Sequence, residues 1–555
     1  MELNIAAVHE AVAAAVPDRE CLVWRDRRHS WAQVTDRTRR LANVLGAHGL
    51  GRRRPLSSCQ GWESPQDLVA LYLLNGNEYL EGMLGAYKAA AAPFNVNYRY
   101  VADELAYVLR DAGTRAVIYH GRYAETLAAV LDRVPTVELL LRVDDGSGDE
   151  LLPGALDYEA ALADASPERP DLDWSGDDLY VVYTGGTTGR PKGVLWRQAD
   201  FVVAALGTRR RDGREFEDLA ELAEAASRND RLRVLPAPPL MHGAAHWNAL
   251  SAWIAGGTVI MQDDTARLDP VDVLSTCQRE AVSSLLIVGD AFARPLLDEL
   301  ARTPYDLNSL RFLLTGGAIL SPSVKAELVE RLPGLSVVDV LGSSETGRQG
   351  VHRSGQSGRP SHRSAGSFVP SDTTAVISED RSRFLAAGER ELGWLAQRGR
   401  VPRGYLGDPD KTNATFPLVK GERVAVAGDR ARLAANGTLE LHGRDSATIN
   451  TGGEKVFAEE VEQAIKHHPA VYDALVVGRP SPRWGQEIVA VVQLRAGQAG
   501  SAALTASILE VAGQQLARYK LPKELLYRAQ VVRSPSGKPD YAWATAEATA
   551  PQPRR

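Results

Sequence analysis

The chain has 555 residues, of which 44% are hydrophobic and 24% are charged, and its formal net charge is −6. This length exceeds what one hydrophobic core usually supports, so we expect at least two domains, and the weak negative charge gives no electrostatic reason to expect nucleic acid as a partner. No stretch approaches the roughly 18 consecutive apolar residues of a membrane span, and the N-terminus lacks a basic segment followed by an apolar one. Three widely spaced cysteines form no metal or redox motif and are typical of a reducing compartment. We therefore expect a cytoplasmic protein without integral membrane contact.

The first two thirds of the chain alternate between helical and strand-like patterns. Residues 31–50 and 66–92 are predicted as helices alternating with short strands, and residues 116–119 as a short buried strand. A second stretch of this type, about 230–345, carries apolar strand candidates at residues 259–260, 285–288, 312–314 and 337–338. Such alternation predicts α/β layers around a largely parallel sheet. Residues 351–385 look more polar and irregular.

The pattern changes from Gly443 onward. A helix after Gly452 and Gly453 that carries Val456, Val461 and Ile465 is predicted first. Strands at 474–477 and 488–494, a helix near 503–518 and a last strand-like pair at 531–532 follow. The predicted fold class is therefore α/β, with a large N-terminal domain of layered α/β subdomains (1–443) and a smaller α+β C-terminal domain (444–555).

A glycine-rich run, Tyr183–Gly193, follows the apolar stretch 179–182. Its eleven residues, YTGGTTGRPKG, combine glycines, threonine hydroxyls, an arginine and a lysine. Glycines let backbone N–H groups surround an anion, and hydroxyls and cations add donors and charge, so the run predicts a phosphate-binding loop. The position of Lys192, between Pro191 and Gly193, does not fit the G-x-x-x-x-G-K-[ST] motif of P-loop NTPases. An ordinary turn closed by Pro191 is the alternative.

Further loops lie at the predicted carboxyl ends of strands. In open α/β sheets ligands bind outside these ends, so the loops at residues 315–318 and 342–345 are expected to form a site. Downstream, the segments Ala427–Arg430, Leu441–Asp445 and Ser534–Pro539 each place a charged residue beside glycine.

Together, these motifs resemble those of the adenylate-forming superfamily, which includes acyl-CoA synthetases, peptide-synthetase adenylation domains and luciferases. The resemblance covers nearly the whole chain, including Asn95–Arg99 and Tyr519–Pro522. It implies that ATP, Mg²⁺ and coenzyme A are bound, that the C-terminal domain is mobile, and that Glu345 coordinates the Mg²⁺ that bridges the phosphates. A single carboxylate can serve Mg²⁺ because substrate phosphates and water complete its coordination shell.

The resemblance also assigns roles to the other motif residues. Asp429 would bind the ribose hydroxyls, and Arg444 would lie near ribose and phosphate. Lys538 would contact the carboxylate and the α-phosphate, offsetting their mutual repulsion. The predicted catalytic residues are Lys538, Glu345, His242 and Thr184. The predicted cofactor-binding residues are Thr184, Gly185, Gly186, Thr187, Thr188, Gly189, Lys192, Gly316, Gly317, Ala318, Leu341, Gly342, Ser343, Ser344, Thr346, Asp429, Arg444, Gly452, Gly453 and Lys455.

The acyl pocket is the least defined part of this prediction. Small residues such as Gly289 suggest room for a bulky or long apolar chain. The segments Gly289–Pro295 and Ile449–Lys455 look most like the actinobacterial branch of acyl-CoA synthetases that act on fatty acids and steroid side-chain carboxylates. The predicted pocket residues are His242, Trp247, Ile287, Gly289, Gly316 and Leu341.

Two positions depart from the family pattern. Leu341 stands where many members carry an aromatic residue that stacks on adenine, so apolar contact would replace stacking. Ser446 stands at the hinge, two residues after Arg444, where an acidic residue or lysine is usual. A small residue there can still absorb the change in backbone angles of a domain rotation.

The predicted function is therefore that of an ATP-dependent acyl-CoA synthetase. The carboxylate of a small-molecule acid attacks the α-phosphate to give acyl-adenylate and pyrophosphate, and the thiol of coenzyme A then displaces AMP. In the second step the loop 451–454 would line the pantetheine channel. There are two alternatives: an adenylating ligase that uses an amine instead of coenzyme A, and a catalytically silent nucleotide-binding protein. A homodimer is possible.

Overall fold

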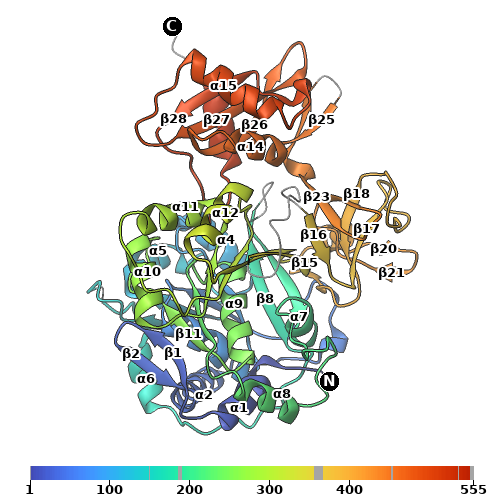
Figure 1. Ribbon diagram of the computed structural model, residues 1–555. Helices are drawn as coiled ribbons and strands as arrows, with labels where there is room; N and C mark the ends of the chain where they lie inside the picture. Colours follow the sequence, from blue (N-terminus) through green and yellow to red (C-terminus); the bar gives the residue numbers. More distant parts are fainter. Residues whose placement is uncertain are drawn as a thin grey trace.

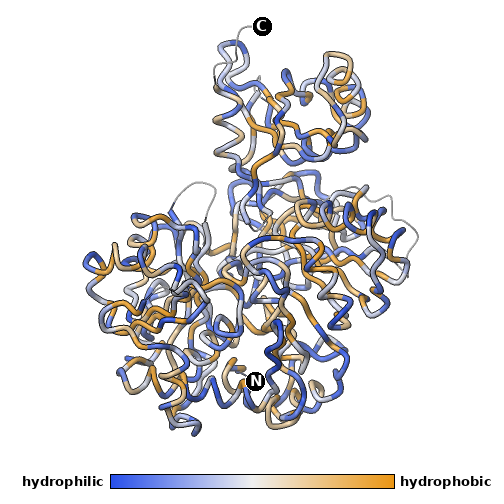
Figure 2. Tube along the Cα trace, turned by 90° about the vertical axis from the view of Figure 1, so that its left-hand side faces the viewer, coloured by the Kyte–Doolittle hydropathy of each residue, from blue (hydrophilic) through white to orange (hydrophobic). Residues whose placement is uncertain are grey.

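The computed structural model describes residues 2–148, 150–185, 190–355, 367–451, 454–535 and 537–550, without the side chain of Ser446. Within these ranges the chain forms a large body and a smaller one, which carries α14, α15 and the last strands and lies above the ends of α11 and α12 (Figure 1). In both bodies hydrophobic segments are concentrated inside and hydrophilic segments outside (Figure 2). This division agrees with the predicted fold class.

The largest sheet crosses the whole large body. Its strands β10 to β14 pair in parallel, and β1 joins β11 in parallel, whereas β15 turns the sheet antiparallel. The inner strands β11 and β12 are buried along their whole length, as continuous apolar runs in parallel sheets usually are. In order across the sheet the strands are β17 (Thr374–Ile377), β18 (Gly393–Gln397), β22 (Asp429–Leu433), β23 (Leu439–Arg444), β16 (Ser367–Pro370), β15 (Gly347–Gly355), β14 (Ser336–Ser343), β13 (Phe312–Gly316), β12 (Ser284–Ile287), β10 (Arg233–Pro236), β11 (Thr258–Met261), β1 (Glu20–Trp24) and β2 (Arg27–Ser30).

A second, wholly parallel sheet and two small antiparallel ones complete the strands of the large body. The pair β8–β9 flanks the glycine-rich run, and β19 extends it. The parallel sheet contains β4 (Ala92–Asn95), β3 (Leu68–Tyr72), β5 (Ala116–His120), β6 (Leu139–Val143) and β7 (Leu156–Asp157). The antiparallel sheets contain β19 (Gly404–Tyr405), β9 (Lys192–Arg197) and β8 (Leu179–Thr184), and β20 (Leu418–Val419) and β21 (Glu422–Arg423).

Helices cover these sheets and fill the space between them. All residues of α3 are buried, and α2 packs along it with its N-cap Ser30 and Gln33 forming a capping box. The helices of the large body are α1 (Ile5–Ala15), α2 (Trp31–Ala47), α3 (Asn77–Lys88), α4 (Ala102–Asp111), α5 (Ala124–Leu131), α6 (Tyr158–Asp164), α7 (Gln198–Ala204), α8 (Leu219–Ser227), α9 (Gly243–Ile254), α10 (Pro270–Arg279), α11 (Gly289–Leu300), α12 (Pro322–Arg331) and α13 (Pro409–Thr415).

The small body has its own sheet and its own hydrophobic core. The long hairpin β26–β27 is antiparallel, β28 joins β27 in parallel, and α14 and α15 pack on one face over a core that includes Val461 and Val476. Its elements are β24 (Thr448–Thr451), β25 (Glu454–Phe457), α14 (Ala458–Lys466), β26 (Val471–Ser481), β27 (Gly485–Leu494), α15 (Ala502–Gly513), β28 (Glu524–Arg528) and α16 (Tyr541–Thr549).

Most predicted strands are confirmed, and three local predictions are wrong. Val456 lies on β25 rather than on the following helix, which begins at Ala458. The pair 531–532 is not a strand; the last strand is β28, and the Val531 N–H donates to the Gln493 side chain at 2.9 Å instead of to a neighbouring strand. Three strands, β15 to β17, occupy described parts of the stretch 351–385 that looked irregular. The domain boundary at 443/444 stays a prediction.

Candidate active site

The carboxyl ends of β13 and β14 form the floor of the candidate site. A Cβ atom at Gly316 would lie 3.1 Å from the Val340 carbonyl oxygen, so the two strands approach too closely there for most side chains. Gly317 follows with a φ of +79°, a conformation that glycine adopts without strain. A Cβ atom on Gly317 would lie 3.8 Å from Cε of Lys538, so the stem of that lysine lies over this turn.

Hydroxyl groups fix the turn after β14. The Thr346 hydroxyl lies 3.0 Å from Ser343 Oγ and accepts the Ser343 N–H at 3.1 Å, and the Trp196 indole donates to the Ser344 carbonyl at 2.8 Å. A Cβ atom at Gly342 would lie 2.2 Å from the Gly347 carbonyl oxygen, so the turn requires glycine there.

Glu345 projects from this turn and is half-buried. The Tyr405 hydroxyl donates to Glu345 Oε1 at 3.0 Å, and burial together with this carboxylate raises the pKa of Tyr405. The second carboxylate oxygen is not used by that bond, so it remains able to accept a ligand.

Asp429 and Arg444 face each other at the end of the β22–β23 ladder. They are direct partners in the strand register, and Arg444 Nε lies 3.3 Å from Asp429 Oδ1. Burial raises the pKa of Asp429, while the guanidinium of Arg444 acts in the opposite direction. The sheet therefore presents a carboxylate and an exposed cation side by side.

Lys538 reaches this group from the small body. The pKa of Lys538 is lowered, first because surrounding protein atoms desolvate the ammonium group and second because the positive charge of Arg444 repels it. The negative charge of Glu345 raises this pKa and so opposes both effects. The side chain of Lys538 keeps contact with solvent. Lys538, Arg444, Glu345 and Asp429 thus form one electrostatic cluster, built from both bodies.

The ends of the glycine-rich run lie beside this cluster. Thr184 and Lys192 are direct partners in the β8–β9 register, so the run between them is a strand-to-strand loop rather than the start of a helix. Lys192 forms an ion pair with Asp408, the N-cap of α13. Gly185 is exposed, and Gly186, Thr187, Thr188 and Gly189 lie outside the described residues.

His242 and Trp247 lie at the beginning of α9. Burial lowers the pKa of His242 to about 3, helped by the positive charge of Lys538, so this imidazole is neutral at physiological pH. The Trp247 indole donates to the Tyr180 hydroxyl at 2.5 Å. That hydroxyl in turn binds Nε2 of His246, whose Nδ1 lies 2.7 Å from the Leu240 carbonyl oxygen.

This chain of contacts assigns the donors. Nδ1 of His246 must donate to the Leu240 carbonyl, so Nε2 accepts from Tyr180, and the Tyr180 oxygen accepts from Trp247. Because Nε2 is an acceptor, His246 is neutral, and burial lowers its pKa to about 4. The network fixes the orientation of Trp247 in the predicted pocket wall.

Several predicted residues have packing contacts of their own, and their roles in the site stay predictions. Ile287 is completely buried in the core, and Leu341 packs against the apolar cluster of β17, β18, β22 and β23. Gly289, with a φ of +57°, is needed for close packing, because a Cβ atom there would lie 2.6 Å from the Ile319 carbonyl oxygen. Ala318 packs on the core below β13, and Lys455 is exposed on β25. Gly452, Gly453 and the Ser446 side chain lie outside the described part.

Tyr405 and Asp408 were missed by the sequence analysis. Both come from a short segment whose place is set by the pairing of β19 with β9, so only long-range contact brings them to Glu345 and Lys192. A Cβ atom at Gly404 would lie 2.7 Å from Thr412 Oγ1, so glycine is needed before Tyr405, but the sequence alone does not show this contact.

Two absences are observed in the described part of the chain. No cluster of three or more His, Cys, Asp or Glu side chains is arranged to hold a metal ion. No described helix has the length and apolar character needed to cross a membrane.

The chain belongs to the AMP-binding enzyme family. It matches the AMP-binding enzyme domain over residues 9–406 and the AMP-binding enzyme C-terminal domain over residues 460–538. The expected membership of the adenylate-forming superfamily is confirmed.

Its relatives include acyl-CoA ligases of actinobacteria. A medium-chain acyl-CoA ligase of Mycobacterium avium is 48% identical over 98% of both chains. A 3-oxocholest-4-en-26-oate–CoA ligase of Rhodococcus rhodochrous is 38% identical over 98% of this chain and 96% of its own. The crystal structure of an anthranilate CoA ligase in complex with anthranoyl-AMP has the same fold, with a TM-score of 0.81 at 20% identity over 98% and 97% of the two chains.

Proposed function

We propose that the protein is an ATP-dependent, AMP-forming acyl-CoA ligase that acts on a medium- or long-chain fatty acid or a steroid side-chain carboxylate. The relatives support the reaction class and this choice of acid, because their names give these substrates and they align with nearly the entire chain. The acid would carry an apolar chain or ring system, and the predicted pocket wall includes the aromatic Trp247.

The observation that carries the catalytic part of the proposal is the position of Lys538. Its stem lies over Gly317, and its charge interacts with Arg444 and Glu345. A cation at this place would offset the repulsion between the carboxylate and the α-phosphate as they approach each other. The substrate carboxylate needs no base, because it is ionised at neutral pH, and the neutral His242 is suited to line its site.

The remaining residues fit ATP and Mg²⁺. Asp429 would accept hydrogen bonds from the ribose hydroxyls, and Lys192 would exchange Asp408 for the outer phosphates. Glu345 would bind Mg²⁺ through Oε2, the oxygen that the Tyr405 hydroxyl does not contact, and phosphate oxygens and water would complete the coordination shell. When bound, Mg²⁺ would neutralise phosphate charge.

One assay tests the proposal. Purified protein is incubated with Mg-ATP and a panel of fatty, aromatic and steroid acids. Pyrophosphate release is measured with and without coenzyme A, and the product is identified by mass spectrometry. We expect acid-dependent pyrophosphate and an acyl-CoA product. Pyrophosphate without a thioester would favour the amine-using ligase, and no pyrophosphate with any acid would favour the silent nucleotide-binding protein. The cytoplasmic location and the homodimer stay predictions.

A further inference from the structure

The first turns of α11 form a contact surface of the large body for the small one. This segment, Gly289–Pro295, was noted in the sequence but has no part in the site described above. Asp290 is buried there, and its Oδ1 accepts the Ser321 N–H at 2.7 Å. Its Oδ2 accepts no hydrogen bond from the described residues. That oxygen lies 3.9 Å from Arg294 and 3.9 Å from Lys466 Nζ, and Lys466 belongs to the small body.

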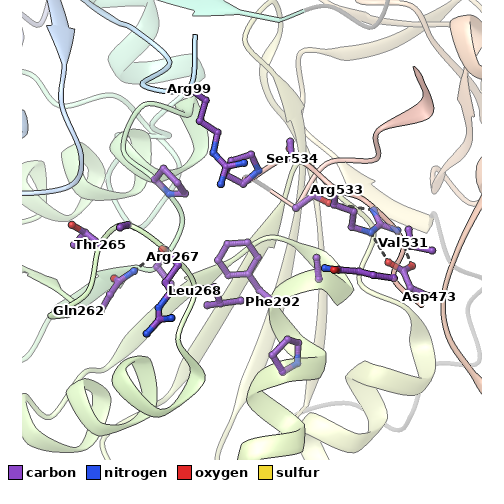
Figure 3. Close-up of a pocket in the computed structure, with 18 of the residues that line it drawn as sticks. Arg99, Gln262, Thr265, Arg267, Leu268, Phe292, Asp473, Val531, Arg533 and Ser534 are labelled. Carbon is purple, nitrogen blue, oxygen red and sulfur yellow. Dashed lines mark hydrogen bonds and ion pairs between the residues drawn. The ribbon is translucent and has the colours of Figure 1, made fainter. Parts of the chain in front are cut away.

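On the other side of this contact, the small body holds a saturated ion cluster. Lys466, the last residue of α14, lies 3.0 Å from Asp473 Oδ1. Arg533 donates to both oxygens of Asp473, at 2.7 and 2.8 Å, as Figure 3 shows. Arg533 also donates to the Gly537 carbonyl at 3.2 Å. A continuous line of contacts therefore runs from Asp290 to the residue before Lys538.

Further contacts join the two bodies at the same surface. A Cβ atom at Gly537 would lie 2.9 Å from the Val288 carbonyl oxygen, so the Lys538 loop rests directly on the strand end before α11. The Tyr472 hydroxyl lies 3.4 Å from Asp298 Oδ2, and the Arg294 guanidinium lies 5.6 Å from the centre of the Tyr472 ring. Beside them is a cleft of about 410 Å³, in which Phe292 faces Arg533 and Val531 (Figure 3).

The charges at this boundary are matched but weakly coupled. Asp290 is the buried anion of the large body at this point, and Lys466 supplies charge from across the boundary without a hydrogen bond. Arg294 of the large body lies at the same distance from this oxygen, so Lys466 is the second cation near Asp290. The pair with Lys466 favours the docked arrangement, because each nearby cation offsets part of the cost of burying a carboxylate. The distance between Asp290 and Lys466 is too long for a close hydrogen bond, so none has to break when the two bodies separate. This suits a contact that would form and release once in each catalytic cycle.

We infer that Asp290 is a positioning residue that holds the small body in the arrangement in which Lys538 lies over Gly317. It contacts no reacting group and acts through Lys466, Asp473 and Arg533. The inference rests on the proposed role of Lys538 in adenylation. It predicts that Asp290 supports the first half-reaction and has no part in the second.

The test compares the two half-reactions in Asp290→Asn. Asparagine keeps the size of the side chain and the acceptor for Ser321 but removes the charge. We expect acid-dependent pyrophosphate release to fall about tenfold, the scale of a coupling free energy between sites. Thioester formation from supplied acyl-adenylate should be unchanged or faster. An equal loss in both half-reactions would overturn the inference.

The matched control is Asp67→Asn. Asp67 is also buried, accepts a backbone N–H at 3.0 Å and is paired with two arginines, but all of these partners belong to the large body. It should affect both half-reactions alike. Asp298→Asn at the same surface provides a second variant. Asp298 is half-buried, so its replacement should disturb folding less than that of Asp290. We expect the same selective loss of the first half-reaction, but a smaller one.

A distance measurement separates this inference from the proposed function. Spin labels at Arg302→Cys and Glu510→Cys, in a Cys59→Ser background, report the distance between the exposed ends of α11 and α15. Asp290→Asn should reduce the population with the short, docked distance; an unchanged distribution would overturn the inference even if Lys538 is catalytic. A different outcome would be full adenylation activity in Lys538→Ala together with a changed distance distribution in Asp290→Asn. It would reject the proposed role of Lys538 but keep the docking contact of Asp290.

Discussion

The two halves of the candidate site are built in different ways. The half in the small body is one long cation on a loop, braced by the buried Asp473–Arg533–Lys466 cluster. The half in the large body consists of groups held at strand ends by hydrogen bonds, a local one for Ser343 and a long-range one from Tyr405 for Glu345. The first half suits the predicted movement of the small body as a rigid unit, whereas the second is built within the large body. The two halves are therefore held by separate sets of contacts.

The largest expected effect concerns the Asp473–Arg533–Lys466 cluster, which we call the brace of the small body. Asp473→Asn removes the charge that Arg533 and Lys466 share inside the protein, where these two cations lower the pKa of Asp473. Breaking such a buried pair costs about 3–5 kcal/mol, so the small body should unfold at lower denaturant concentration. Chemical denaturation, followed by tryptophan fluorescence, measures this. Asp290→Asn should cost much less, and an equal loss would contradict the distinction between brace and contact.

Loss of the Lys538 cation itself should affect one half-reaction only. Lys538→Ala should reduce adenylation by about 10²–10³-fold, the cost of removing one preorganised charge-stabilising group. Thioester formation from supplied acyl-adenylate should be largely spared. Pyrophosphate release and acyl-CoA formation are measured separately, with the exposed Lys523→Ala of the same body as control. Equal loss of both activities would refute the proposed role.

The half of the site in the large body should show a dependence of stability on pH. The pKa of His246 is lowered to about 4, below the ordinary value of about 6.5, so between these values the unfolded chain binds a proton that the folded chain does not. Its contribution is therefore complete above pH 6.5 and is lost as the pH falls toward 4, about 2 kcal/mol by pH 5. His246→Gln should flatten the fall of the melting temperature between pH 6.5 and 5. A matching slope in this variant and the parent would contradict the assigned network.

The smallest expected effect concerns a single hydrogen bond in the same half. Tyr405→Phe removes the donor to Glu345 without changing the shape of the side chain. A hydrogen bond to a charged group contributes about 1.5–3 kcal/mol, of which water replaces a part, so we expect adenylation to fall about tenfold at limiting ATP. Initial rates as a function of ATP concentration measure this. A variant with unchanged KM and kcat would show that Tyr405 does not orient Glu345.

The strands and the strand-end loops were predictable because their signals are local. The apolar runs 285–288 and 312–314 coincide with β12 and β13, of which β12 is fully buried. Gly316 and Gly342 lie near the ends of β13 and β14, where another backbone approaches closely, and Gly317 has a positive φ. The strand predicted at 531–532 is wrong because its local pattern does not reveal which partner its backbone finds. Val531 is buried and Val532 is exposed, and the pair joins none of the described ladders; the Val531 N–H donates to the Gln493 side chain of β27 instead. Period and composition cannot tell these two cases apart.

The sequence by itself determined the class of protein, because phosphate, magnesium and lysine motifs are short segments whose chemistry can be recognised in order along the chain. It could not place Tyr405 beside Glu345, His246 behind Trp247, or Asp290 across from Lys466. Tyr405 lies 60 residues from Glu345, and Asp290 and Lys466 belong to different bodies. His246 and Trp247 are neighbours in the sequence but are linked through Tyr180, more than 60 residues away. Only the packing of sheets and helices decides such distances, and it was this packing that showed which groups of the site each body supplies.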